Sequence, residues 1–251
     1  MIKLFRRVRQ RLLTENKFSR YFLYGVGEIL LVVIGILIAV QINAWHENRT
    51  LKINETNILS QLNIDLKENH KELLELYEFM EVSNLFGKKI LNHLQYKNEV
   101  TYSLRYWVEG FGSNNIFNNA NTTYKNLENS SNNIISNDSL RLRITLMYEL
   151  DFSNVHRREA MLYAEYFPNY KKELLKNFKI SPVMNQWLDE ATLEINTPIN
   201  LKELKQNESY KNALVDLYNF RALRLKWLKK SLVDLEQLIK AIDCEIKETL
   251  T

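Results

Sequence analysis

Residues 21–44 read YFLYGVGEILLVVIGILIAVQINA, and Glu28 is the only charged residue among them. An α-helix rises 1.5 Å per residue, so about 23 residues span about 34 Å, enough to cross the hydrocarbon core of a bilayer with some tilt. Tyr21 and Tyr24 at one end and Trp45 at the other are residues that concentrate at membrane interfaces. The stretch therefore predicts a transmembrane helix over residues 21–45.

Positive charge is concentrated before this stretch. Residues 1–20 carry seven Lys and Arg and one Glu, whereas the whole chain has a formal net charge of only +4. The positive-inside rule then predicts a cytoplasmic N-terminus and places the rest of the chain across the membrane. We expect the basic arm to contact anionic lipid headgroups. Because no basic stripe continues beyond the arm, we expect no nucleic-acid binding.

The arm also has the pattern of an amphipathic helix lying in the headgroup layer, with a disordered basic tail as the alternative. A cleaved signal peptide would need an apolar core of about 7–15 residues and a small-x-small cleavage site. The apolar stretch here is longer, and no Ala-x-Ala follows Ala39. We therefore expect an uncleaved signal-anchor helix.

Glu28 is the one chemically unusual residue, because a carboxylate within an apolar span is costly and is a functional candidate by default. It could form a helix–helix hydrogen bond in a complex, reach the cytoplasmic interface, or couple to a proton or ion. Gly35 and Ala39 form a small-xxx-small pair that would let a second span approach closely. These three residues are the candidate intramembrane functional or packing residues.

A family resemblance rests on MIKLFRRVRQ at residues 1–10 and GEILLVVIGILIAVQINAWHENR at residues 27–49. Both stretches are similar to a family of uncharacterised single-pass membrane proteins of Bacteroidetes, known only as a domain of unknown function. Residues 123–141 also resemble the Thr-Tyr…Leu-Arg region of that family, with Ser and Asn at 130–133 where members usually have Gly. The resemblance implies an inner-membrane location and a periplasmic domain, and it implies no activity.

A seven-residue apolar repeat begins after the span and predicts one long helix to about Tyr96. Asn69, Ser83 and Gly87 interrupt it. The repeat returns near the C-terminus, where only Arg221 breaks it. The two sets of positions are Leu59, Leu62, Leu66, Leu73, Leu76, Met80, Ile90 and Leu94, then Leu214, Tyr218, Leu225, Leu228, Leu232, Leu235, Ile239, Ile242 and Ile246.

The predicted fold is therefore all-α: a transmembrane helix that continues into a periplasmic antiparallel helical bundle over residues 46–251. Six Gly and three Pro are few for 251 residues, which favours long helices joined by few loops. The predicted shorter elements are a helix over Tyr102–Phe111, a loop over Ser113–Asn121, a helix from Tyr124, a turn at Ser130–Asn133, a helix from Ser139 to Phe178 capped by Asn137 or Asp138 and kinked at Pro168, a helix from Ser181-Pro182 to Ile195, and a capping box at Asn200-x-x-Glu203.

The third long helix, from about Ser139, is rich in aromatic residues, and for these we expect core packing rather than a ligand pocket. The four histidines are dispersed, and none has the spacing of a zinc site or of a Glu-x-x-His carboxylate-bundle motif. Cys244 is the only cysteine, which excludes an intrachain disulfide and a cysteine zinc site. Residues 156–159 (His-Arg-Arg-Glu) could bind an anion, but a solvated helix face is the simpler interpretation. We therefore expect no enzyme activity, no metal and no cofactor.

Three functional hypotheses follow. A membrane-anchored periplasmic scaffold or interaction protein, a homo-oligomer or part of a membrane complex, is favoured by the long heptad helices and the missing catalytic motifs. A ligand-sensing bundle could pass a helix shift through the membrane, but residues 1–20 leave no room for an output domain. The third hypothesis is an accessory subunit of an ion-driven membrane complex that uses Glu28.

Overall fold

The computed structural model describes residues 18–130, 134–179 and 197–250. Within these ranges the chain is helical apart from short connections and two strands of two residues each, so the all-α prediction is confirmed. The chain forms two compact units, residues 1–55 and residues 56–251, which are described separately below. The predicted amphipathic arm before residue 18, the predicted helix over residues 181–195 and most of the predicted turn at 130–133 lie outside the described residues.

Helix α2 (Phe18–Tyr96) contains the apolar stretch of residues 21–44. In the first unit its large apolar side chains are exposed, among them Leu31, Ile36 and Val40. In the described part of the chain it is the one helix long and apolar enough to cross a membrane, and none of its apolar window is buried by the protein itself. Because so large an apolar surface is unfavourable in water, this part of α2 is suited to serve as a membrane anchor.

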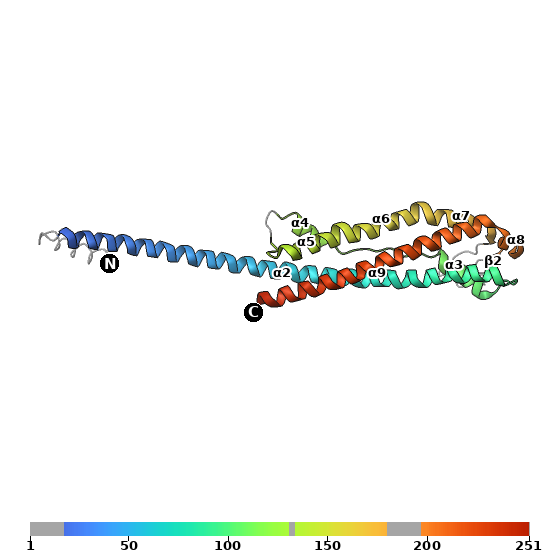
Figure 1. Cartoon of the computed structure of the whole chain (residues 1–251), viewed down its shortest axis with the longest axis horizontal. Helices are drawn as coiled ribbons and strands as arrows, with labels where there is room; N and C mark the ends of the chain where they lie inside the picture. The colour runs from blue at the N-terminus through green and yellow to red at the C-terminus, as the bar shows by residue number, and fades with distance from the viewer. Residues whose placement is uncertain (1–17, 131–133, 180–196, 251) are drawn as a thin grey trace, which may run out of the picture. The chain divides into compact units, whose positions relative to one another are not determined.

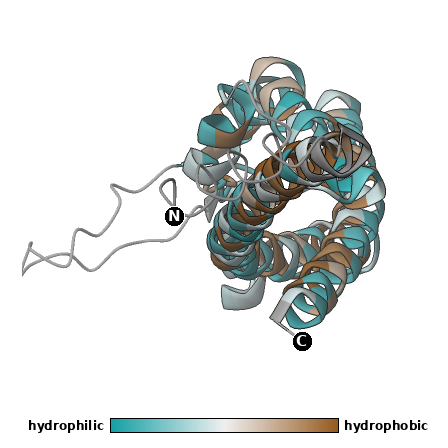
Figure 2. Ribbon diagram, turned by 90° about the vertical axis from the view of Figure 1, so that its left-hand side faces the viewer, coloured by the Kyte–Doolittle hydropathy of each residue, from teal (hydrophilic) through white to brown (hydrophobic). Residues whose placement is uncertain are grey.

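The second unit is a bundle of three long helical lines that lie side by side (Figure 1). Contacts from Asn63 to Asp243 and from Ser83 to Arg221 show that the first and last lines run antiparallel. Seen end-on, the hydrophilic faces of the bundle helices lie outward (Figure 2). The lines are the second half of α2, then α5 (Asp138–Leu146), η1 (Met147–Phe152), α6 (Ser153–Met161), η2 (Leu162–Tyr166) and α7 (Phe167–Asn177), and last α9 (Glu208–Leu250).

Shorter elements connect these lines. α3 (Tyr102–Gly112) and α4 (Thr122–Glu128) follow α2. The two strands β1 (Phe178–Lys179) and β2 (Thr197–Pro198) pair antiparallel after α7, and α8 (Leu201–Gln206) leads into α9.

The apolar repeat on α2 is confirmed, because all eight of its positions are buried. On α9 the repeat is only partly right. Alternate positions such as Leu228 and Leu235 are buried, whereas Leu225 and Leu232 are half-buried. Since α9 packs against α5–α7 and shares an apolar cluster with α2, its buried surface is wider than one seam. It also includes Leu217, Arg221, Arg224, Ser231 and Leu238.

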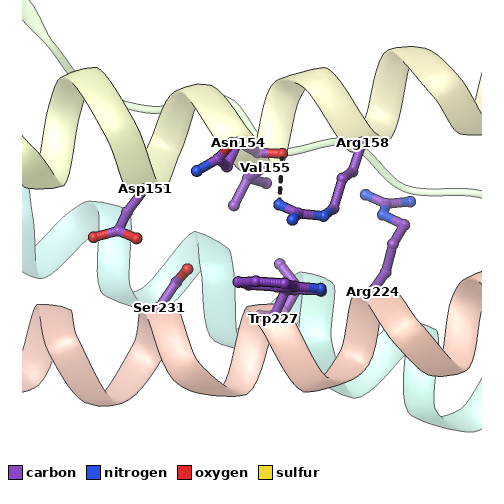
Figure 3. A pocket seen from close by; sticks show the side chains of 8 residues that line it. Asp151, Asn154, Val155, Arg158, Arg224, Trp227 and Ser231 are labelled. Carbon is purple, nitrogen blue, oxygen red and sulfur yellow. Dashed lines mark hydrogen bonds between the residues drawn. The ribbon is translucent and has the colours of Figure 1, made fainter.

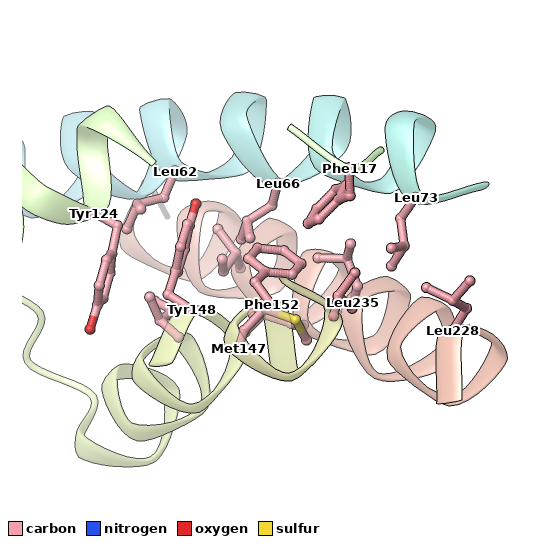
Figure 4. Close-up of a cluster of buried hydrophobic side chains, with 14 of the residues drawn as sticks. Leu62, Leu66, Leu73, Phe117, Tyr124, Met147, Tyr148, Phe152, Leu228 and Leu235 are labelled. Atoms are coloured by element: carbon pink, nitrogen blue, oxygen red, sulfur yellow. The ribbon is translucent and has the colours of Figure 1, made fainter. Parts of the chain in front are cut away.

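Most aromatic residues of the third long helix pack in the core, as expected. Tyr148 stacks on Tyr124 with ring centroids 4.3 Å apart, and Phe152 packs against Phe117 at 5.3 Å. These rings lie among leucines from α2 and α9 in the larger of two apolar clusters (Figure 4). Tyr163 is the exception at 40% exposed.

Two helices begin directly after the capping residues that the sequence predicts. The side chain of Asn137 accepts a hydrogen bond from the Leu140 amide at 3.1 Å, and that of Asn200 accepts from the Lys202 amide at 3.0 Å. Pro168, predicted to kink its helix, lies in the first turn of α7, directly after the π-helical η2. Because proline has no N–H, the carbonyl four residues earlier loses its helical partner, and a π-helical turn is one way to absorb such a break.

Candidate functional site

Ser83 and Gly87, which interrupt the apolar repeat on α2, lie where α3 packs closely against this helix. A Cβ on Gly87 would lie 2.6 Å from Cε2 of the buried Phe111, so only glycine fits against that ring. Gly110 on α3 is similarly covered by the ring of Phe86. The hydroxyl of Ser83 donates to the Gly110 carbonyl at 3.0 Å. The interruptions therefore bring α2 and α3 into close contact.

Arg221, the interruption on α9, is 2% exposed and lies at the centre of this region. Its Nη1 donates to the Phe111 carbonyl at 2.7 Å and to Oγ of Ser83 at 2.9 Å. Its Nη2 donates to the Ser113 carbonyl at 3.0 Å and to Oδ1 of Asn114 at 2.6 Å. Burial lowers the pKa of Arg221 to about 10, so the guanidinium is still charged at neutral pH. Arg221 thus joins α9 to α2 and to the end of α3.

The segment after α3, residues 113–121, forms neither helix nor strand and runs along α2, and we call it the strap. Asn69 of α2 holds its far end, accepting from the Ala120 amide at 2.6 Å and donating to the Ala120 carbonyl at 2.9 Å. Glu72 accepts from the Asn118 amide at 3.1 Å. Buried backbone polar groups need such partners, so the polar residues on α2 satisfy the strap.

Helix α6 holds the other side of the strap. Oε1 of Glu159 accepts from the Phe117 amide at 3.2 Å, and Nε2 of His156 lies 2.9 Å from Oδ1 of Asn119. Glu159 is only 7% exposed, and burial raises the pKa of its carboxyl, against the opposing effect of Arg224 at 3.8 Å. The interpretation of residues 156–159 as a solvated face is therefore wrong for Glu159, because the strap and α9 cover it.

An open groove lies between α5–α6 and α9, and we call it the α5–α9 groove. It consists of a cavity of about 280 Å³ and a smaller one of about 20 Å³, and Asp151 lines both. The smaller cavity is shown in Figure 3. The linings are Arg143, Leu146, Met147, Leu150, Asp151, Lys230, Asp234, Gln237 and Leu238 for the larger, and Asp151, Asn154, Val155, Arg158, Arg224, Trp227, Leu228 and Ser231 for the smaller.

Charged groups surround the smaller cavity. The guanidinium of Arg158 lies over the ring of Trp227, 4.2 Å from its centroid (Figure 3). Burial lowers the pKa of Arg158 and raises the pKa of Asp151. Arg224 is 2% exposed, and its Nη2 has no hydrogen-bond partner among the described residues; it is 3.8 Å from Glu159. A cavity of about 20 Å³ holds about one water molecule, so the smaller cavity alone is no substrate pocket.

The candidate residues of the span belong to the first unit. Glu28 and Ala39 are exposed on α2, and a Cβ on Gly35 would meet no atom within 4 Å. Gly35 and Ala39 are four residues apart and so share one face of the helix. That face is open to a second helix.

The described residues include no group of three or more His, Cys, Asp or Glu side chains placed to hold a metal ion. His93 is buried, with Nε2 2.9 Å from the Glu99 carbonyl, and so has a structural partner. Cys244 is exposed on α9. Comparisons with protein-family models, with curated proteins and with solved structures find no match to this chain.

Proposed function

We propose that this chain is a membrane-anchored interaction protein of the inner membrane, with its N-terminus in the cytoplasm and its helical bundle in the periplasm. The observation that carries the proposal is the apolar window of α2, which the protein itself leaves wholly exposed. The basic residues before the span support the orientation. The resemblance of residues 1–49 to the Bacteroidetes membrane family supports the choice of membrane.

A binding role rather than a catalytic one is supported by what the polar groups of the bundle do. Arg221, Asn69 and Glu159 form hydrogen bonds with the backbone of the strap or its flanks. They stabilise a fixed surface, and the α5–α9 groove on that surface is open to a partner. We propose a homo-oligomer or a complex with another membrane protein, with the face of Gly35 and Ala39 in contact with a second span.

Purification from native membranes in mild detergent tests this proposal. The tagged full-length chain should elute as a complex larger than one chain, and its partners can be identified by mass spectrometry. Gly35→Leu should weaken the complex, because a large side chain keeps a second helix at a distance, whereas Ile36→Leu should leave it unchanged. A chain that stays monomeric and crosslinks to nothing in cells would contradict the proposal.

A further inference from the structure

We infer that the α5–α9 groove binds an acidic amphipathic helix of a partner protein. The inference rests on the proposed function and deepens it, because it names the surface and the chemistry of the partner. Its support comes from the apolar floor of the groove, its charge and its length.

The floor of the groove is apolar and exposed. Leu146 and Leu150, which line the larger cavity, are 44% and 52% exposed, and Leu142 continues their line at 58%. These leucines are four residues apart, so they share one side of the α5–η1 line. Trp227 of α9, 43% exposed, lies beside the smaller cavity. The apolar face of an amphipathic helix can pack on such a row.

The net charge of the groove lining indicates the charge of the partner that it would bind. Its ionisable side chains are four basic and two acidic, which gives a net charge of +2: Arg143, Arg158, Arg224 and Lys230 against Asp151 and Asp234.

Not all of these charges are paired within the protein. Lys230 pairs with Asp234 at 2.5 Å, and the buried Arg224 lies 3.8 Å from Glu159. Neither Arg143 nor Arg158 pairs with a carboxylate in the described part of the chain. Asp151 adds one negative charge between these two arginines in the sequence, but it leaves the lining positive. Electrostatic complementarity therefore favours a partner that carries acidic side chains beside its apolar ones.

A second copy of the chain does not fit as the occupant. A two-fold interface pairs a patch with itself, so the net positive lining would face an identical lining. If the axis passed between Leu150 and Asp151, Arg143 of one copy would face Arg158 of the other. Like charges in such positions oppose association.

The length of the lining favours a helix over a small molecule. Arg143 and Arg158 are 15 residues apart, which is about 22 Å along a helix. The π-helical η1 lies in the middle of this distance, and π-helical turns occur frequently at functional sites. A bound helix of about 15 residues would therefore cover the whole groove.

Site-specific photocrosslinking in native membranes tests the inference. Benzoylphenylalanine replaces Leu150 in the full-length chain, and the control position is Ile64, 68% exposed on α2. We expect a partner to crosslink from Leu150 only, through a peptide with net negative charge and apolar residues three and four apart. Arg143→Glu should lower the yield at least tenfold, and an acidic-to-basic change in the partner's peptide should restore it. Lys229→Glu, an equal charge reversal on the exposed side of α9, should leave the yield unchanged.

Near-UV circular dichroism of each variant establishes that the bundle is folded. The inference is overturned if Leu150 crosslinks to lipid, to a second copy or to nothing, or if Arg143→Glu leaves the yield unchanged. If the chain still co-purifies with a partner in those cases, only the groove is wrong and the proposed function stands. If the chain stays monomeric and nothing co-purifies, both fail.

Discussion

Replacing Arg221 by methionine should make the bundle much easier to unfold. Methionine occupies part of the same volume but donates no hydrogen bond. The Phe111 and Ser113 carbonyls and the side-chain oxygens of Ser83 and Asn114 then lose their guanidinium partner. Water has little access to this region, since Ser83 and Phe111 are also buried.

The size of the effect follows from these four bonds. A hydrogen bond to a charged group contributes about 1.5–3 kcal/mol, but bonds within one network do not add. A buried acceptor left without a partner costs about 1–3 kcal/mol, and for the four acceptors together we take about 3–5 kcal/mol. We expect the free energy of unfolding to fall by that amount. For a domain of this size the melting temperature should then fall by about 6–20 °C.

Urea and thermal unfolding of the full-length chain in detergent, followed by near-UV circular dichroism, measure this loss. Hydrogen exchange adds a local measurement, because the amide of Phe117 in the strap should exchange faster in Arg221→Met. Lys226→Met is the matched control: Lys226 lies on the same helix but is exposed, so its replacement should change stability by less than about 0.5 kcal/mol.

A loss below about 1 kcal/mol, with unchanged exchange in the strap, would refute the role of Arg221 as a structural centre. Apolar replacements of buried ionic groups are neutral or stabilising in some proteins, so the measurement separates the two cases. The bundle would then be held by apolar packing alone.

Two further predictions concern the contacts around the strap. Gly87→Ala should destabilise the bundle by about 1–3 kcal/mol although alanine favours helix, because the new Cβ meets the buried ring of Phe111, whereas Gly112→Ala should have little effect. Glu159→Gln should become more stable relative to the native chain as the pH is raised from about 4 to 8, because burial raises the pKa of Glu159 in the folded state.

The sign of the second prediction follows from proton linkage. With its pKa raised by burial, the folded protein binds a proton at Glu159 more readily than the unfolded chain does. Stability from this group is therefore present below the ordinary glutamate pKa and is lost as the pH rises through the raised value. Glutamine has no such dependence. A constant stability difference across this pH range would mean that attraction to Arg224 offsets burial, and a difference that moves in favour of the native chain would mean that it outweighs burial. For Gly87→Ala, a gain in stability would show that the Phe111 ring moves aside freely.

The sequence predicts the apolar framework of the bundle well, because leucines at heptad spacing report directly on the buried face of a long helix. The eight positions from Leu59 to Leu94 are all buried, and Asn137 and Asn200 cap helices as their side-chain chemistry suggests.

The polar interior could not be predicted in the same way. Arg221 looked like a break in the repeat and Glu159 like a surface charge, yet both are buried. Their burial depends on the path of the strap, whose backbone groups need partners, and helical periodicity carries no information about that path. The α5–α9 groove was missed for a related reason: Leu146 and Leu150 are apolar but exposed, and spacing alone does not separate such residues from core.

Labelling of Cys244 tests the central claim, a membrane anchor with the bundle in the periplasm, most directly. Cys244 is the only cysteine and is exposed on α9, so it reports the side on which the bundle lies. A membrane-impermeant maleimide should label it in cells whose outer membrane alone is permeabilised. A Cys244→Ser chain that carries Thr14→Cys should be labelled only after the inner membrane is lysed. Protection of Cys244 until the inner membrane is lysed would contradict the account.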